Sequence, residues 1–229
     1  MFYLVKTPWL LKKIYPYGIW DLPVSEKKVF LSFDDGPHPD ITLFVLEQLT
    51  RFNAKGSFFC IGKNVIAHPE IFEMIVRKGH RVGNHTQNHL NGWKTADDVY
   101  IDNILQAQQH IPSNLFRPPY GRITKSQCLL LEKKLPGIKI IMWDILSADF
   151  DTRIDGGKCT SNVLKNVKPG SIVVFHDSEK AFPRLQKCLP EVLENLSERG
   201  YIFDVIPENF SCKYCSQFWR RAIKKVGPG

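Results

Sequence analysis

The sequence predicts an α/β fold, a single distorted (β/α) barrel with about seven parallel strands. Short apolar runs alternate with amphipathic segments of helical spacing along almost the whole chain. Polar residues suited to chemistry directly follow the carboxyl ends of several apolar runs. At 229 residues, with 43% hydrophobic and 24% charged residues, the chain is long enough for one sizeable domain without disulfide bonds.

The expected strands are short apolar runs bounded by turn residues. We expect seven, at 29–33, 56–61, 80–84, 114–117, 138–143, 171–176 and 201–205. Six helices are expected between them, at 40–53, 63–78, 95–110, 124–135, 158–167 and 182–199. Gly79 is a candidate stop for the second helix, and Thr95 with Asp98 resembles a capping box before the third. Strands that alternate with helices pair in parallel through right-handed crossovers.

The chain divides into three expected parts. Residues 1–27 form an N-terminal apolar and aromatic segment packed on the domain, 28–207 form the barrel, and 208–229 form a basic C-terminal tail. Lysine and proline interrupt the first 20 residues, so no signal peptide or transmembrane segment is recognised. These observations predict a cytoplasmic or envelope-associated protein. Docking of the N-terminal aromatic residues on the barrel and peripheral contact with a membrane or the cell envelope both stay open.

The charge balance is basic. Lys and Arg number 31 against 23 Asp and Glu, a formal net charge of +8 that could favour nucleic acid, anionic lipid or an anionic polymer such as a cell-wall glycan. The basic residues are scattered, and no nucleic-acid-binding motif accompanies them. Nucleic acid is therefore not an expected partner.

The six cysteines do not indicate a disulfide framework in a chain of this length, which favours a reducing compartment. Cys60 and Cys128 lie within apolar patterns and are expected to be small buried residues. Cys212 and Cys215 have the spacing of a metal-binding pair. No second pair or partnering histidine follows them, so they indicate a zinc knuckle only weakly.

Two adjacent carboxylates, Asp34 and Asp35, leave the apolar run 29–33 and precede Gly36-Pro37. A surface turn is the ordinary explanation of such a tetrapeptide. However, the ends of other predicted strands carry further residues suited to chemistry: His85 and His89, Arg117, Asp149 and His176. Because the carboxyl ends of barrel strands meet at one rim, we expect all of these side chains to converge.

Two histidines and one carboxylate, with a position left open for water, form a known catalytic metal arrangement. His85 and His89, together with one of the two aspartates, supply that set for a divalent metal, Zn²⁺ before Co²⁺ or another transition metal. Successive side chains leaving a strand diverge, so the other aspartate is free to accept a proton from water. A lone histidine such as His176 is more often structural, but the site otherwise lacks an acid to protonate a departing amine.

Five ordered motifs resemble those of the NodB-like polysaccharide deacetylases, carbohydrate esterase family four, over residues 28–205. They are Ser32-Phe33-Asp34-Asp35-Gly36-Pro37, His85-Thr86-Gln87-Asn88-His89, Arg117-Pro118-Pro119-Tyr120-Gly121, the stretch from Trp143 to Phe150, and Val174-Phe175-His176. The resemblance implies metal-dependent removal of N-acetyl groups from a glycan containing N-acetylglucosamine, such as peptidoglycan or a chitin oligomer.

The resemblance also implies a role for each site residue. It assigns metal ligation to Asp35, His85 and His89. It assigns the general base to Asp34, oriented by a bidentate Arg117, and the acid to His176, paired with Asp149. The backbone N–H of Tyr120 would donate to the developing oxyanion. Substrate-binding positions implied in the same way are Pro118, Tyr120, Trp143 and Val174.

Three residues depart from the common family pattern. Leu146 stands where an aspartate is usual, Phe150 where a tryptophan is usual, and Val174 where a leucine is usual. We expect these exchanges to alter the leaving-group side of the pocket, so they bear on substrate choice more than on reaction type.

Two other functions stay open. The chain could be a C–N hydrolase or deacetylase acting on a small molecule or a lipid-linked sugar. It could also be a non-catalytic carbohydrate-binding module that kept the fold, although binding alone requires neither Asp34 nor Arg117.

Overall fold

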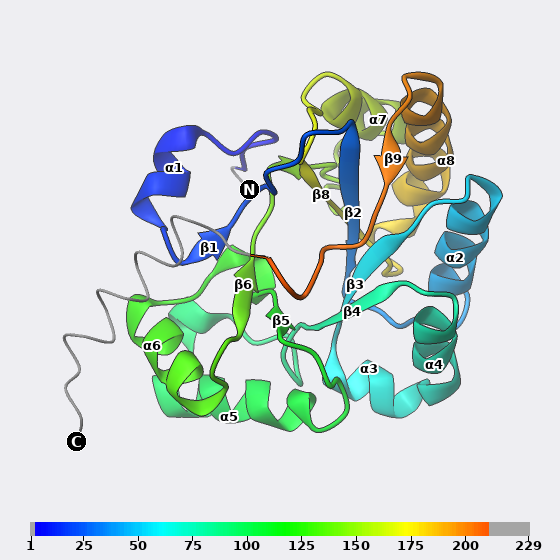
Figure 1. Cartoon of the computed structure of the whole chain (residues 1–229). Helices are drawn as coiled ribbons and strands as arrows, with labels where there is room; N and C mark the ends of the chain where they lie inside the picture. The colour runs from blue at the N-terminus through cyan, green and yellow to red at the C-terminus, as the bar shows by residue number, and fades with distance from the viewer. Residues whose placement is uncertain (1–2, 211–229) are drawn as a thin grey trace.

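Parallel β-strands form the centre of the molecule, and helices cover their outer side (Figure 1). The computed structural model describes residues 3–210. Eight strands follow one another in the order β1-β6-β5-β4-β3-β2-β8-β7, and β9 pairs with β2, every pair being parallel. Their bounds are β1 Gly18–Ile19, β2 Lys28–Asp34, β3 Gly56–Cys60, β4 Arg81–Asn84, β5 Leu115–Phe116, β6 Lys139–Ile141, β7 Ile145–Leu146, β8 Ile172–His176 and β9 Ile202–Phe203.

This sheet confirms the predicted distorted barrel of parallel strands. All seven expected strands are present, and the difference in number comes from β1 and β7, which were not expected. β1 lies in the N-terminal segment, which was expected to lie outside the barrel, and β7 begins only four residues after β6 ends, with no helix between them.

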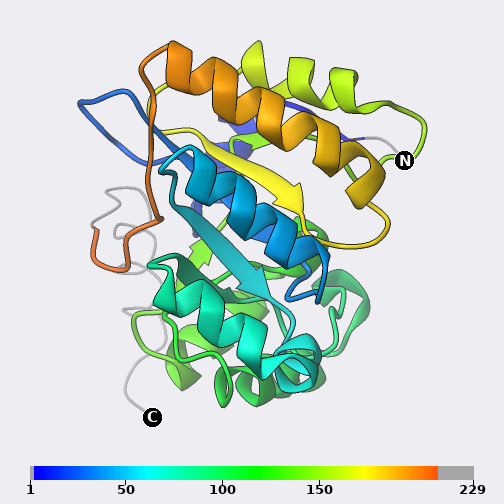
Figure 2. The same ribbon diagram turned by 90° about the vertical axis from the view of Figure 1, so that its right-hand side faces the viewer.

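Helices follow most of the strands, as an alternating pattern requires. Figure 2 shows α8 beside α7 and α2 on the outer face of the sheet. Within residues 3–210 the α-helices are α1 Trp9–Ile14, α2 Ile41–Arg51, α3 Gly62–Ala67, α4 Pro69–Arg77, α5 Asp97–Gln108, α6 Lys125–Lys134, α7 Gly156–Leu164 and α8 Phe182–Glu198. Two short 3₁₀ helices are η1 Gly92–Lys94 and η2 Pro119–Gly121.

Two helix predictions were wrong in detail. The single helix expected at 63–78 is two helices, because Pro69 begins α4 and forces the preceding His68 out of the helical conformation, to φ −135° and ψ 59°. The capping box expected at Thr95 is absent, and the Thr95 hydroxyl donates to the carbonyl of Asn91 instead. A capping box does form at the start of α6, from Thr124 and Gln127. Gly79 follows α4 with φ +75°, as expected of a helix stop.

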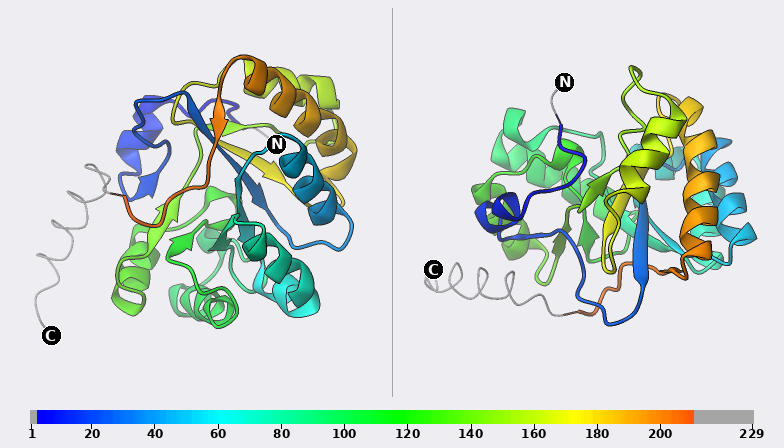
Figure 3. Two further views of the ribbon diagram at one scale, coloured as in Figure 1. Left: turned by 45° about the vertical axis from the view of Figure 1, so that its right-hand side comes forward. Right: turned by 90° about the horizontal axis from the view of Figure 1, so that it is seen from above.

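The N-terminal segment covers the gap between the two ends of the strand order. Val5 accepts a hydrogen bond from the Leu146 N–H at 2.8 Å, and the Thr7 N–H donates to the carbonyl of Asp144 at 2.9 Å, so this segment runs antiparallel beside β7. It then forms α1 and enters the sheet as β1 at the opposite end. Both views in Figure 3 show α1 on the side of the barrel away from α8.

Strand alternation decides which residues of β2 face the barrel interior. Phe30 packs in a central cluster with Phe59, Leu115 and Ile172, whereas the next residue, Leu31, packs toward the helices. Side chains of a strand alternate between the two faces, so Ser32 and Asp34 share the interior face with Phe30. The core thereby points Asp34 into the carboxyl end of the barrel.

None of the helices in residues 3–210 has the length and apolar character of a membrane span. Cys60 and Cys128 are buried, as predicted. The expected tail beyond Phe210, including Cys212 and Cys215, lies outside the described residues.

Candidate metal centre and catalytic site

The predicted site residues gather at the carboxyl ends of the strands. Asp34 is the last residue of β2 and His176 the last of β8, while His85 directly follows β4 and Arg117 directly follows β5. Asp149 lies three residues beyond β7. The parallel sheet therefore brings residues separated by up to 142 positions to one rim.

Asp35, His85 and His89 form a cluster suited to a metal ion. One ligand atom from each side chain lies within 4.8 Å of the others. The nearest Asp35 oxygen, Oδ1, is 3.2 Å from His89 Nε2 and 3.7 Å from His85 Nε2. This oxygen is buried and accepts no well-aligned hydrogen bond from residues 3–210. A carboxylate oxygen without a donor, facing two imidazole nitrogens, fits a divalent cation.

The tautomer of His85 supports this arrangement. Its Nδ1–H donates to the carbonyl of Arg117 at 2.7 Å, which leaves Nε2 unprotonated and directed toward Asp35. Burial lowers the pKa of His85 to about 4, so the ring is neutral near pH 7, as ligation requires. Burial opposes ionisation of Asp35, but the neighbouring His89, His176 and His85 hold its pKa below the usual range.

The two histidines reach the cluster from a loop rather than from a helix. Both Thr86 and His89 have positive φ, which curls the chain back within four residues. Asn103 of α5 fixes this loop, because its side-chain oxygen accepts hydrogen bonds from the backbone N–H groups of Gln87 and Asn88, both at 3.0 Å. The position of each imidazole is thus set by backbone contacts outside the cluster.

Asp34 is held by a fully buried arginine. Arg117 Nη1 donates to Asp34 Oδ1 at 2.7 Å and to the Ser32 hydroxyl at 2.8 Å. Its Nε and Nη2 donate to the carbonyls of Ile141 and Met142, so the expected bidentate pairing was wrong. Burial lowers the pKa of Arg117 although Asp34 opposes that shift. Every Arg117 nitrogen has a partner, and Asp34 is fixed through one oxygen.

His176 is paired with Asp149 through two contacts. The His176 Nδ1 lies 2.8 Å from Asp149 Oδ1, and the His176 backbone N–H donates to Asp149 Oδ2 at 2.7 Å. Burial alone would favour the neutral ring, but Asp149, with Asp35 and Asp34 behind it, raises the pKa of His176 to about 10. The imidazole is therefore protonated at neutral pH and able to act as an acid.

The backbone around the site is conformationally unusual. Among the described residues six that are not glycine have positive φ, and five of them lie in or beside the site. Those five are Asp35 (85°), Thr86 (67°), His89 (57°), Tyr120 (61°) and Ala148 (65°). Such conformations cost energy and concentrate where a side chain or N–H group must be aimed at a ligand.

Asp177 is a buried carboxylate beside the site that the sequence did not indicate. It accepts hydrogen bonds from the Gly36 N–H at 3.0 Å and the Thr42 hydroxyl at 2.5 Å. A Cβ at position 36 would collide with the Asp177 carboxylate, which explains the glycine after Asp35. An acidic residue directly after a site histidine at a strand end was the available signal. Asp177 therefore fixes the turn that carries Asp35.

Residues 21–135 match the family model described as polysaccharide deacetylase. A peptidoglycan-N-acetylglucosamine deacetylase of Bacillus cereus is 32% identical over 213 residues, covering 90% of this chain and 99% of the relative. The chain belongs to the polysaccharide deacetylase family. This confirms the resemblance carried by the five motifs.

Further members of the polysaccharide deacetylase family are similar in sequence and structure. A chitooligosaccharide deacetylase of Bradyrhizobium is 34% identical over 158 residues, covering 66% of this chain and 71% of the relative. A crystal structure of a peptidoglycan N-acetylglucosamine deacetylase in complex with 4-naphthalen-1-yl-N-oxidanyl-benzamide matches with a TM-score of 0.79. It is 28% identical and covers 89% of this chain and 97% of that one.

Membership of the polysaccharide deacetylase family does not by itself establish activity. A CE4 family pseudoenzyme from Bacillus anthracis shares the fold, with a TM-score of 0.72, 23% identity, and coverage of 83% of this chain and 68% of that one. Catalysis has to be argued from the side chains at the rim rather than from the fold.

The four substrate-binding positions predicted for a polysaccharide deacetylase differ in exposure. Tyr120 is 53% exposed and its ring lies 4.7 Å from that of His89. Trp143 is partly exposed and borders Gly121. Pro118 and Val174 are buried, so only the first two offer surface to a ligand.

Two departures from the family pattern have clear surroundings. Leu146 is buried in β7, where its N–H bonds to Val5. Phe150 is partly exposed and packs edge to face against His176, with ring centroids 5.3 Å apart. Phe150 thus stands directly beside the residue that we expect to be the acid.

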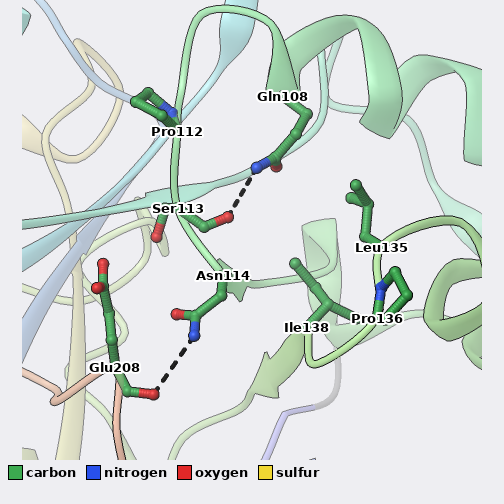
Figure 4. Close-up of a pocket in the computed structure, with 8 residues that line it drawn as sticks. All are labelled: Gln108, Pro112, Ser113, Asn114, Leu135, Pro136, Ile138 and Glu208. Atoms are coloured by element: carbon green, nitrogen blue, oxygen red, sulfur yellow. Dashed lines mark hydrogen bonds between the residues drawn. The ribbon is translucent and has the colours of Figure 1, made fainter.

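A separate pocket of about 500 Å³ is lined by residues that precede β5 and β6, at the end of these strands opposite the site, and Figure 4 shows its lining side chains. Its walls include Ser113 and Asn114, which precede β5, and Ile138, which precedes β6. None of the predicted site residues lines it.

Proposed function

We propose that the protein hydrolyses N-acetyl groups of glycans that contain N-acetylglucosamine, such as peptidoglycan or chitin oligomers, with release of acetate and with a divalent metal as cofactor. The proposal is carried by one observation. The Asp35, His85 and His89 cluster shares a rim with an arginine-held carboxylate and an aspartate-paired histidine. These are the groups that amide hydrolysis at neutral pH requires.

The metal we favour is Zn²⁺, because two imidazoles and a carboxylate are a common ligand set of catalytic zinc, and Co²⁺ is the alternative. Asp35, His85 and His89 would hold it. When bound, the metal would supply a Lewis acid for the amide carbonyl and lower the pKa of water.

The protein's own residues would move two protons. Asp34, held in place by Arg117, accepts a proton from the attacking water as the new C–O bond forms. Protonated His176 donates a proton to the amine nitrogen as the C–N bond breaks, and Asp149 stabilises the imidazolium before that transfer. The Tyr120 backbone N–H would donate to the oxyanion.

Metal analysis and acetate release test this function together. Purified protein should contain a divalent metal and release acetate from peptidoglycan or chitin oligomers. A chelator should abolish that release, and Zn²⁺ should restore it. His89→Ala should lose metal and activity together, because it removes one of the three ligands. Metal-loaded protein without activity on a broad panel of acetylated sugars would contradict the proposal.

The small-molecule alternative differs in substrate length. A deacetylase of monosaccharides or lipid-linked sugars should turn over N-acetylglucosamine derivatives as fast as oligomers. A glycan deacetylase should favour the oligomers, since longer chains offer more binding energy. The ratio of kcat/KM on the two substrates decides between these functions.

A non-catalytic carbohydrate-binding module would need no general base. Such a module should bind glycan equally well as wild type and as Asp34→Asn, with no acetate released by either. The formal net charge of +8 is compatible with contact with an anionic cell-envelope polymer for either function.

A further inference from the structure

The N-terminal segment reaches His176, the proposed acid, through two aromatic contacts. The ring of Tyr3 packs edge to face on Phe150, with centroids 5.3 Å apart and planes at 70°. Phe150 packs in the same manner on His176, at 5.3 Å and 80°. Tyr3 is thus one ring removed from His176, although 173 positions separate the two residues in the sequence.

The tripeptide Asp149-Phe150-Asp151 links these residues a second time. Asp149 holds the His176 ring and backbone, as described above. Two residues on, Asp151 Oδ2 accepts a hydrogen bond from the Tyr3 hydroxyl at 2.8 Å. Arg153 Nε donates to the other oxygen of Asp151 at 2.9 Å, which fixes that carboxylate. Each residue of the tripeptide therefore contacts either His176 or Tyr3.

Tyr3 is held in place by the rest of its segment. Lys6 Nζ donates to Asp144 at 2.5 Å, and the Thr7 hydroxyl donates to the carbonyl of Trp143 at 2.8 Å. The Leu146 N–H bonds to Val5, so three successive residues, 5, 6 and 7, are bonded to the 143–146 stretch. A segment anchored along this length can serve as a brace for a neighbouring loop.

We infer that Tyr3 is a positioning residue for His176. Tyr3 packs on Phe150 and holds the Asp149–Asp151 tripeptide against the His176 imidazole. The inference rests on the proposed function, in which His176 is the acid. Without the Tyr3 ring, Phe150 loses its packing on one side, and the hydrogen bond that holds Asp151 to the N-terminal segment is also lost. The His176 ring then has more orientational freedom, and misplacement of a catalytic group is costly.

Two Tyr3 variants and one neighbour separate this role from general stability. Tyr3→Ala should lower kcat on an acetamide substrate by about tenfold and leave the bound metal unchanged. An acetyl ester with a good leaving group should be affected less, because its departure needs less protonation. Tyr3→Phe keeps the ring and should recover most of the activity. Leu4→Ala is the control, since Leu4 is the next residue and is 40% exposed.

A spectroscopic measurement tests the inference without turnover. The imidazole proton resonances of His176, in full-length protein loaded with Zn²⁺, should shift in Tyr3→Ala and stay close to wild type in Tyr3→Phe and Leu4→Ala. Unchanged His176 resonances in Tyr3→Ala, or an equal loss on amide and ester, would overturn the inference. If wild-type protein releases no acetate, the proposed function fails, while the resonances still decide whether Tyr3 positions His176.

Discussion

Asp34 and Asp144 are both buried carboxylates paired with cations, yet they differ in how completely they are satisfied. Asp34 is held by Arg117 through one oxygen, and within residues 3–210 no group donates to its Oδ2. Asp144 accepts from Lys12 on one oxygen and from Lys6 and the Ser171 hydroxyl on the other. Asp34 therefore keeps one oxygen that no described residue occupies, whereas both oxygens of Asp144 accept hydrogen bonds.

The surroundings of the two residues agree with that difference. Asp34 is the last residue of β2 and lies at the rim, next to the cluster of candidate metal ligands. Asp144 lies between β6 and β7, and the N-terminal segment covers it. Burial would raise the pKa of Asp144, but Lys12, Lys6 and Ser171 lower it below the usual range. A buried ion pair therefore indicates function only where one partner keeps an unused, accessible acceptor.

The largest effect should follow from Asp34→Asn. Asparagine keeps an oxygen opposite Arg117 but cannot take the proton of water, so kcat should fall by about 10²–10⁴. The amount of bound metal should be unchanged, because Asp34 is not one of the three candidate metal ligands. Acetate release and elemental analysis of the same sample check this prediction. Full activity of the variant would refute Asp34 as the base and remove the contrast with Asp144.

Asp144→Ala should act on stability instead. It leaves the Lys6 and Lys12 ammonium groups without their shared partner and should lower the free energy of unfolding by about 2–4 kcal/mol. The estimate is reduced because these lysine side chains are 31% and 20% exposed. Urea denaturation measures the change, and Asp102→Ala, at an exposed position of α5, is the control. An Asp144→Ala variant as stable as Asp102→Ala would show that the buried pairing contributes nothing.

The position of Asp34 in the site could be predicted from the sequence because it depends on the topology of the sheet. Parallel strands bring their carboxyl ends together, so Asp34, His85 and His176 could be placed at one rim before any contact was known. The break before Pro69 was also accessible, since the residue preceding a proline is disfavoured in a helix. It was missed because the hydrophobic period continues through that position.

The pairing of Asp144 with its lysines could not have been predicted in the same way. Lys6 and Asp144 are 138 positions apart, and no local pattern pairs a lysine with one particular distant aspartate. Lys6 reaches Asp144 because it lies opposite Ile145 of β7, a strand of only two residues. The same limit applies to Tyr3, which contacts Phe150 only because the N-terminal segment runs beside β7.

A third buried carboxylate, Asp177, lacks a cation and should respond to pH. Burial, with a contribution from Asp35, raises the pKa of Asp177 to about 7, above its value in the unfolded chain. The folded state then binds the proton more tightly, so this contribution to stability is complete below about pH 4 and is lost as the pH rises through about 7. Asp177→Asn cannot ionise. The stability of metal-free wild type relative to this variant should decline by up to about 4 kcal/mol across that range, as measured by urea denaturation. A constant difference would contradict the raised pKa.

The smallest effect should come from Lys6→Met, which tests the contribution of one of the three donors to Asp144. The substitution keeps an apolar stem of similar length but removes the ammonium group that donates to Asp144 and to the carbonyl of Asn166. Lys12 and Ser171 still donate to the carboxylate, so the loss in the free energy of unfolding should be about 1 kcal/mol, well below that of Asp144→Ala. Urea denaturation of both variants compares them directly. If Lys6→Met costs as much as Asp144→Ala, a single ammonium supplies the whole stabilisation, and the saturation of Asp144 by three donors is not what distinguishes it from Asp34.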